Sequence, residues 1–97
     1  MRTTILPPAE ADLVDAVEFY ISEGGSEVAR GLVEEVRRLA SVLAMWPKLG
    51  RSTGQNVRVI PLRRFPFSVV YRIDHDEILI LAVAHHSRSP RFWRRRV

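Results

Sequence analysis

The residues best suited to chemistry gather near the C-terminus, in the segment AVAHHSRSPRFW at 82–93. His85 and His86 could exchange protons near neutral pH, because an unperturbed imidazole has a pKa of about 6.5. Arg88 could bind an anion through its planar guanidinium group, which keeps its proton. These residue types suit metal-free cleavage of RNA, which needs a base, an acid and cations beside the phosphate. They also suit a docking surface, because arginine and aromatic residues dominate interface energies.

A nuclease built from this chain would combine both histidines with arginines from the neighbouring strands. Tyr71 could also donate a proton, but it alternates with Phe67 and Val69 along an apolar strand face, which predicts a core position. A histidine at the rim of a sheet is also commonly an ordinary hydrogen-bonding residue, so both interpretations stay open. The candidate catalytic residues of the nuclease hypothesis are Arg58, Arg72, His85, His86 and Arg88.

A docking surface would use the same region without any bond being broken. The stretch RSPRFWRRR places two aromatic residues among five arginines, and one ring could anchor the contact. Alternatively, one ring folds back over the core while the arginines remain in solvent. The predicted target-binding residues are Arg88, Arg91, Phe92, Trp93, Arg94, Arg95 and Arg96.

The sequence offers little for other common chemistries. It contains no cysteine, and neighbouring histidines in a strand point to opposite faces, so we predict neither a metal site nor a cofactor. It also has no glycine-rich phosphate loop. The absence of cysteine suits a reducing compartment, and we expect a cytoplasmic protein with no membrane span.

The charge is divided between the two halves of the chain. Residues 1–48 carry five basic and eight acidic side chains, a net charge of −3, whereas residues 49–97 carry ten basic and three acidic side chains, a net charge of +7. Fourteen of the fifteen basic residues are arginine. A basic half of this kind predicts an anionic partner, either nucleic acid or an acidic protein surface.

A small α+β domain must position these residues. We predict a single domain over residues 1–97, with an N-terminal strand and an antiparallel helical hairpin packed on a small antiparallel sheet, in the order β-α-α-β-β-β. The last segment would form one helical turn, with Ser89 as its cap and Pro90 at its first position, or would be disordered. The predicted strands are 2–6, 57–62, 67–73 and 77–84, the helices are about 9–22 and 26–46, and 48–56 is a loop.

Three details of this arrangement follow from the residue pattern. The strand at 77–84 is apolar on both faces and should be central. Pro61 indicates that its strand is an edge at that point, because proline cannot donate a ladder hydrogen bond. Apolar residues at helical spacing predict the buried stripe of the second helix, which comprises Val28, Leu32, Val36, Leu39, Leu43 and Trp46.

Three segments together resemble a known family. ADLVDAVEFY, RRFPFSVVYRI and ILILAVAHHSRSPRFWRRR, with the predicted order of elements, resemble the ParE-type toxins of the RelE/ParE superfamily of bacterial toxin–antitoxin modules. The resemblance covers about Ala9 to Arg96. Its most specific parts are R-x-F-P-[FY]-x-V-x-Y, here Arg63 to Tyr71, and A-V-x-H-x-x-R-x-P-x-[FY]-W, here Ala82 to Trp93.

The resemblance implies a toxin that a co-expressed, ParD-like antitoxin holds inactive by wrapping across it. ParE-type members stabilise the cleaved complex of DNA gyrase with DNA and so block replication. The antitoxin is expected to be acidic or amphipathic and to lie against the helical hairpin and the sheet edge. The predicted antitoxin-binding residues are Val17, Tyr20, Arg58, Arg63 and Phe65.

RelE-type members of the superfamily instead cut mRNA on the ribosome, and two positions bear on this alternative. Where that branch often has a C-terminal tyrosine, this chain places Trp93, which cannot transfer a proton. Where that branch has a basic residue at the start of the third strand, this chain has Ser68. These departures favour gyrase poisoning, with the mRNA endonuclease as the alternative enzyme and a non-toxic, antitoxin-bound partner as a third hypothesis.

Overall fold

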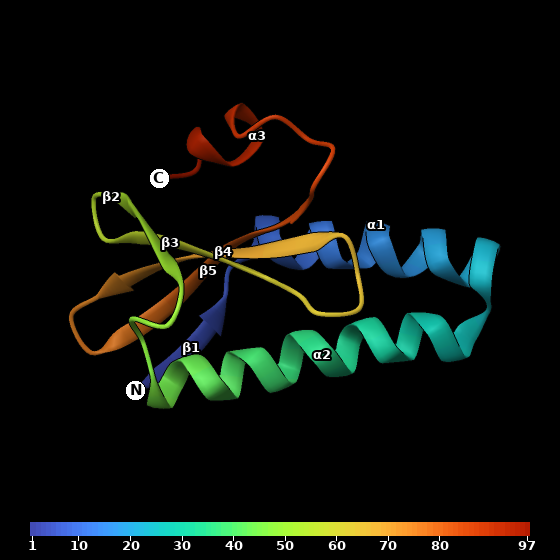
Figure 1. The fold of residues 1–97 in the computed structure, drawn as a ribbon, viewed down its shortest axis with the longest axis horizontal. Coiled ribbons are helices and arrows are strands. Elements are labelled where there is room, and N and C mark those ends of the chain that lie inside the picture. The colour runs from blue at the N-terminus through green and yellow to red at the C-terminus, as the bar shows by residue number, and fades with distance from the viewer.

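The computed structural model describes all of residues 1–97 and shows a five-stranded sheet with helices on both faces (Figure 1). The predicted strand–helix–helix–strand order is confirmed, with one further strand in the segment that we predicted to be a loop. The elements are β1 (Arg2–Ile5), α1 (Pro7–Gly24), α2 (Ser26–Met45), β2 (Arg51–Gly54), β3 (Val57–Pro61), β4 (Phe67–Asp74), β5 (Glu77–His85) and α3 (Arg91–Arg94).

Helices α1 and α2 form the predicted antiparallel hairpin. Prolines occupy the first turn of α1, where their missing N–H groups have no intrahelical partner to lose. Gly25 joins the two helices at a φ of 91°, a conformation that residues with a Cβ rarely adopt. None of the helices combines the length and the apolar character needed to cross a membrane.

The predicted stripe of α2 is buried along its middle and exposed at both ends. Leu32, Val36 and Leu43 are fully buried against the sheet. Val28 and Trp46 are exposed, which corrects the prediction at these two positions. Trp46 lies just past the last helical residue, with a φ of −129° and a ψ of 73°, so helical spacing no longer sets its direction.

The sheet has the order β1-β5-β4-β3-β2. We predicted an antiparallel sheet, but the observed sheet is mixed. β1 pairs with β5 in parallel, while all other neighbours are antiparallel. Parallel pairing is possible because the helical hairpin carries the chain away from β1 before the remaining strands form. β5 lies inside the sheet, between β1 and β4, and is not an edge strand, as predicted. Pro61 lies beyond the part of β3 that pairs with β2, so its strand is an edge there, as predicted.

Two apolar cores lie on opposite faces of the sheet. The larger one joins α1 and α2 to side chains such as Val69, Tyr71 and Ile80. The smaller one lies under α3, where Trp93 packs among five strand residues and is only 9% exposed. Figure 1 shows α3 across the sheet from α2. The strand residues of the smaller core are Val57, Val70, Leu81, Ala82 and Ala84.

A β-bulge in β5 determines which side chains face the helices. Val70 pairs with Ala82 and Tyr71 with Ile80, so Leu81 is an extra residue on β5. The alternation of side chains between the two faces of the sheet is therefore shifted by one residue after Leu81. Ile80 and Val83 both contribute to the larger core, whereas Leu81 and Ala82 both contribute to the smaller one. The same shift turns His85 toward the helices, where its ring packs edge-on against Phe67 at a centroid distance of 5.0 Å.

Tyr71 joins the core to the chain between α2 and β2. Its hydroxyl donates to the Pro47 carbonyl at 2.7 Å and accepts from the Gly50 amide at 2.8 Å. Gly50 must lack a side chain, because a Cβ there would lie 2.8 Å from the tyrosine ring. Burial raises the pKa of the Tyr71 phenol, while the Gly50 hydrogen bond and the charge of Arg58 act in the opposite direction. Tyr71 is thus a structural residue, as its strand position predicted.

Candidate functional site

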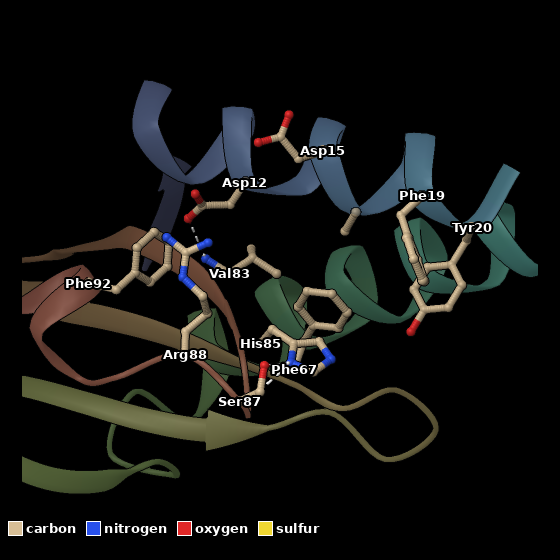
Figure 2. Close-up of a pocket in the computed structure, with 11 residues that line it drawn as sticks. Asp12, Asp15, Phe19, Tyr20, Phe67, Val83, His85, Ser87, Arg88 and Phe92 are labelled. Atoms are coloured by element: carbon tan, nitrogen blue, oxygen red, sulfur yellow. Dashed lines mark hydrogen bonds between the residues drawn. The ribbon is translucent and has the colours of Figure 1, made fainter. Parts of the chain in front are cut away.

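A groove of about 350 Å³ lies between α1 and the chain that continues from β5 (Figure 2). One wall is the side of α1 that faces the end of the sheet. The opposite wall comes from the first residue of β4, the end of β5 and the segment that leads into α3. The labelled lining residues are Asp12, Asp15, Phe19, Tyr20, Phe67, Val83, His85, Ser87, Arg88 and Phe92.

An aromatic cluster forms one end of this groove. Tyr20 makes edge-to-face contacts with Phe19 at 5.3 Å, Phe65 at 5.4 Å and Phe67 at 6.3 Å between ring centroids. Phe19 itself is 58% exposed, an unusual position for a large apolar side chain on a helix. The groove therefore presents aromatic surface that could bind apolar side chains from another molecule.

The predicted antitoxin-binding residues are only partly brought together. Tyr20 and Phe65 are in contact beside the groove, and Val17 is half-buried against the larger core. Arg63 lies in the loop between β3 and β4, where its amide donates to the buried Glu35 carboxylate. Arg58 lies elsewhere, because its guanidinium donates to the carbonyls of residues 48 and 50 at 3.2 and 2.7 Å.

The hydrogen bonds of His85 define its proton arrangement. The Ser87 amide, which can only donate, lies 3.0 Å from Nδ1, so Nδ1 accepts and the neutral ring carries its proton on Nε2. The Ser87 hydroxyl lies 2.7 Å from the same nitrogen. Neither ring nitrogen is therefore free to take a proton from a substrate without breaking the contact with residue 87.

The other residues of the nuclease hypothesis are divided between the two faces of the sheet. His86 Nε2 contacts the Ser68 hydroxyl at 3.0 Å on the face that bears α3. Arg72 lies on that face too, because its neighbours Tyr71 and Ile73 pack in the larger core. Arg58 and His85 lie on the opposite face, which α1 and α2 cover. Of the five candidates, the structure brings only His85 and Arg88 to the groove, while Arg58, Arg72 and His86 lie away from it.

Asp12 joins three parts of the chain at the wall of the groove. Its carboxylate accepts two bonds from the Arg96 guanidinium, at 2.6 and 3.1 Å, and one from the Val83 amide, at 3.0 Å. Arg96 also donates to the Leu81 carbonyl at 3.0 Å. The Val83 amide and the Leu81 carbonyl are backbone groups of β5 beside the bulge. The Asp12–Arg96 ion pair supplies hydrogen-bond partners to both and attaches the end of the chain to α1.

The structure divides the predicted target-binding residues into three groups. Trp93 is in the smaller core and Arg96 is held by Asp12, so both stabilise the fold. Phe92 is half-buried, with the guanidinium carbons of Arg88 and Arg96 at 4.0 and 4.6 Å from its ring centroid. The four remaining arginines are exposed and form no ion pair: Arg88, Arg91, Arg94 and Arg95.

The short helix α3 forms where the sequence predicted a helical turn, displaced by one residue. Pro90 occupies the cap position and the helix begins at Arg91. The Ser89 hydroxyl still accepts a bond from the Arg91 amide, at 3.2 Å. Order in this segment comes from Trp93 and Arg96, which link it to the strands and to α1.

Seven residues of the groove were not among the predicted site residues: Asp12, Asp15, Ala16, Phe19, Phe67, Val83 and Ser87. Phe19 could have been found, because a phenylalanine beside the apolar stripe of a helix predicts an exposed aromatic side chain. Asp12 and Asp15 gave the ordinary pattern of acids in the first turns of a helix. The structure has no group of three or more histidine or acidic side chains placed to hold a metal ion.

Comparisons with known proteins identify the family. Residues 4–90 match the family described as the ParE toxin of the type II toxin–antitoxin system parDE. A chain in the solved structure of the chromosomal ParDE toxin–antitoxin system from P. aeruginosa is similar, with 30% identity and a TM-score of 0.77 over 88% of this chain and 95% of that one. No curated protein matches the sequence. The family match over most of its length shows that this chain belongs to the ParE toxins of type II toxin–antitoxin systems.

Proposed function

We propose that this ParE toxin inhibits DNA gyrase by binding, stabilises the cleaved gyrase–DNA complex, and is neutralised by a cognate ParD-like antitoxin. Membership of the ParE family supports the target. The observation that carries inhibition by binding is the separation of the proton-transfer candidates. His85 Nδ1 and His86 Nε2 make contacts on opposite faces of the sheet, so the two histidines do not converge on one point. A ribonuclease needs an acid–base pair within reach of one phosphate.

Purified gyrase tests this function. Titrating the toxin into a supercoiling reaction should reduce supercoiled product, and linear DNA should accumulate after detergent and protease treatment, because a stabilised cleaved complex releases broken duplex. A control reaction contains toxin already mixed with its antitoxin. Undiminished supercoiling at a large excess of toxin would contradict the proposal. New 5′ ends on translated mRNA, mapped by primer extension, would favour the endonuclease instead.

The groove beside α1 is the surface that we propose for the antitoxin. Its aromatic lining suits the apolar face of an amphipathic segment, and the exposed ring of Phe19 offers an anchor. Asp15 and Arg88 lie at the groove and could pair with opposite charges on that segment. A segment bound there would contact both α1 and the chain after β5, in agreement with an antitoxin that wraps across the toxin.

Replacing Phe19 by alanine should weaken antitoxin binding by about 30-fold, which corresponds to about 2 kcal/mol. Val14→Ala is the matched control, because Val14 is a similarly exposed apolar residue of α1 that lies outside the groove. Titration of each toxin variant with the antitoxin, followed by calorimetry, measures the dissociation constants. Equal losses for the two variants would place the contact elsewhere on the helix.

A further inference from the structure

We propose that the end of the chain binds the sugar–phosphate backbone of duplex DNA through Arg91, Arg94 and Arg95. We call residues 88–97 the arginine cap. The proposal rests on the gyrase function above and adds to it that the toxin touches the DNA of the complex as well as the enzyme.

All charged side chains of the arginine cap are positive. Residues 78–97 contain no aspartate or glutamate, while the cap carries five arginines. Asp12 neutralises Arg96, but Arg91, Arg94 and Arg95 are exposed and pair with no carboxylate. Three unpaired guanidinium groups within five residues produce a local positive potential that attracts anions. Guanidinium groups match phosphate oxygens with paired hydrogen bonds.

The cap presents no exposed aromatic anchor, and the terminal Val97 is its one exposed large apolar side chain, which favours DNA over an acidic protein surface. Trp93, the largest side chain of the cap, is 9% exposed and packs on the sheet. Phe92 is half-buried and covered by the guanidinium groups of Arg88 and Arg96. Protein interfaces usually contain a buried aromatic or aliphatic centre. Interfaces with DNA are more polar and more positively charged.

The base of the cap is fixed. Trp93 joins α3 to the smaller core, the Asp12–Arg96 pair ties the last residues to α1, and the Ser89 hydroxyl accepts the Arg91 amide at the start of α3. Arg91, Arg94 and Arg95 therefore project from an ordered backbone, so little chain entropy is lost on binding. Figure 1 places α3 across the sheet from α2, so a duplex bound at α3 would lie over the face opposite that helix.

Fluorescence anisotropy with a short labelled DNA duplex and the full-length chain tests the proposal. The triple variant R91Q/R94Q/R95Q should bind about tenfold or more weakly at about 0.1 M salt. The slope of log K against log salt should become shallower by about 0.9 for each phosphate that the variant no longer neutralises. The control R30Q/R37Q/R38Q removes the same charge from exposed positions on α2 and should change the affinity by less than about threefold.

The outcomes separate this proposal from the gyrase function. Equal weakening by the two triple variants, or no binding of the unaltered chain to DNA, would overturn the proposal. So would a cap variant that loses binding to gyrase alone and keeps its affinity for DNA, because the cap would then bind protein. If the cap variant loses DNA binding but the unaltered toxin leaves supercoiling intact, the DNA site stands and the gyrase function fails.

Discussion

Replacing Trp93 by alanine is expected to lower the free energy of unfolding by about 3–5 kcal/mol, the range measured for large aromatic residues truncated in a core. Trp93 is 9% exposed and fills the smaller core between α3 and the sheet. The loss is large for a chain of this size, because a small domain has only about 5–15 kcal/mol of stability in total. Urea unfolding followed by circular dichroism measures the change.

Two further variants make the test specific. Trp93→Phe should recover part of the lost stability, because it keeps an apolar ring in the same space. Arg95→Ala, two residues along and exposed, should stay within about 0.5 kcal/mol of the unaltered chain. A Trp93→Ala chain as stable as the Arg95→Ala chain would show that the indole is not part of a core. Truncation at residue 88 would remove the indole too, so it would confuse loss of folding with loss of activity.

Replacing Asp12 by alanine is expected to lower the free energy of unfolding by about 2–3 kcal/mol. Breaking a fully buried ion pair costs about 3–5 kcal/mol, and this pair is partly open, with side chains 21% exposed for Arg96 and 11% for Asp12. The change removes three hydrogen bonds from the carboxylate and leaves the Val83 amide beside the bulge without its acceptor. Thermal and urea unfolding measure the loss.

A double-mutant cycle identifies the origin of this loss. Asp12→Asn keeps an acceptor for the Val83 amide and should cost less than Asp12→Ala. Combining Asp12→Ala with Arg96→Met should cost clearly less than the sum of the single changes, with a coupling of about 1–2 kcal/mol. Asp15→Asn, on the same helix and without an ion pair, should change stability by no more than about 0.5 kcal/mol. Strict additivity in the Asp12–Arg96 cycle would refute a stabilising pair at this position.

Elements with a regular apolar pattern could be predicted from the sequence, whereas β2 could not. The i, i+4 spacing of α2 and the alternation of β4 reflect burial, which the sequence records directly. β2, with the sequence RSTG, is exposed throughout and is held by backbone pairing with β3 and by one side-chain bond, from the Thr53 hydroxyl to the Val57 carbonyl. The parallel pairing of β1 with β5 also leaves no local signal, because it joins residues such as Arg2 and Glu77 across most of the chain.

The site was predictable in its location but not in the roles of its residues. The chemistry-bearing segment at 82–93 does lie at the groove and the cap, yet Asp12 looked like an ordinary acid in a helical first turn. Its partner Arg96 is 84 positions away and sits in a run of three arginines that look alike in the sequence. Only the folded chain distinguishes the ion-paired arginine of that run from its exposed neighbours, and the buried Trp93 from the half-buried Phe92.

The extra residue at Leu81 sets the face of the sheet on which every later side chain of β5 lies. If β5 kept both Leu81 and Ala82 but paired with β4 without the bulge, alternation would place Ala84 on the groove side and turn His85 away from it. The turn at 74–76 is exposed and lies on the other side of this point, so its length is free to vary without moving either surface. Relatives of this toxin that share the groove should therefore keep the bulge together with its extra residue, or lose both.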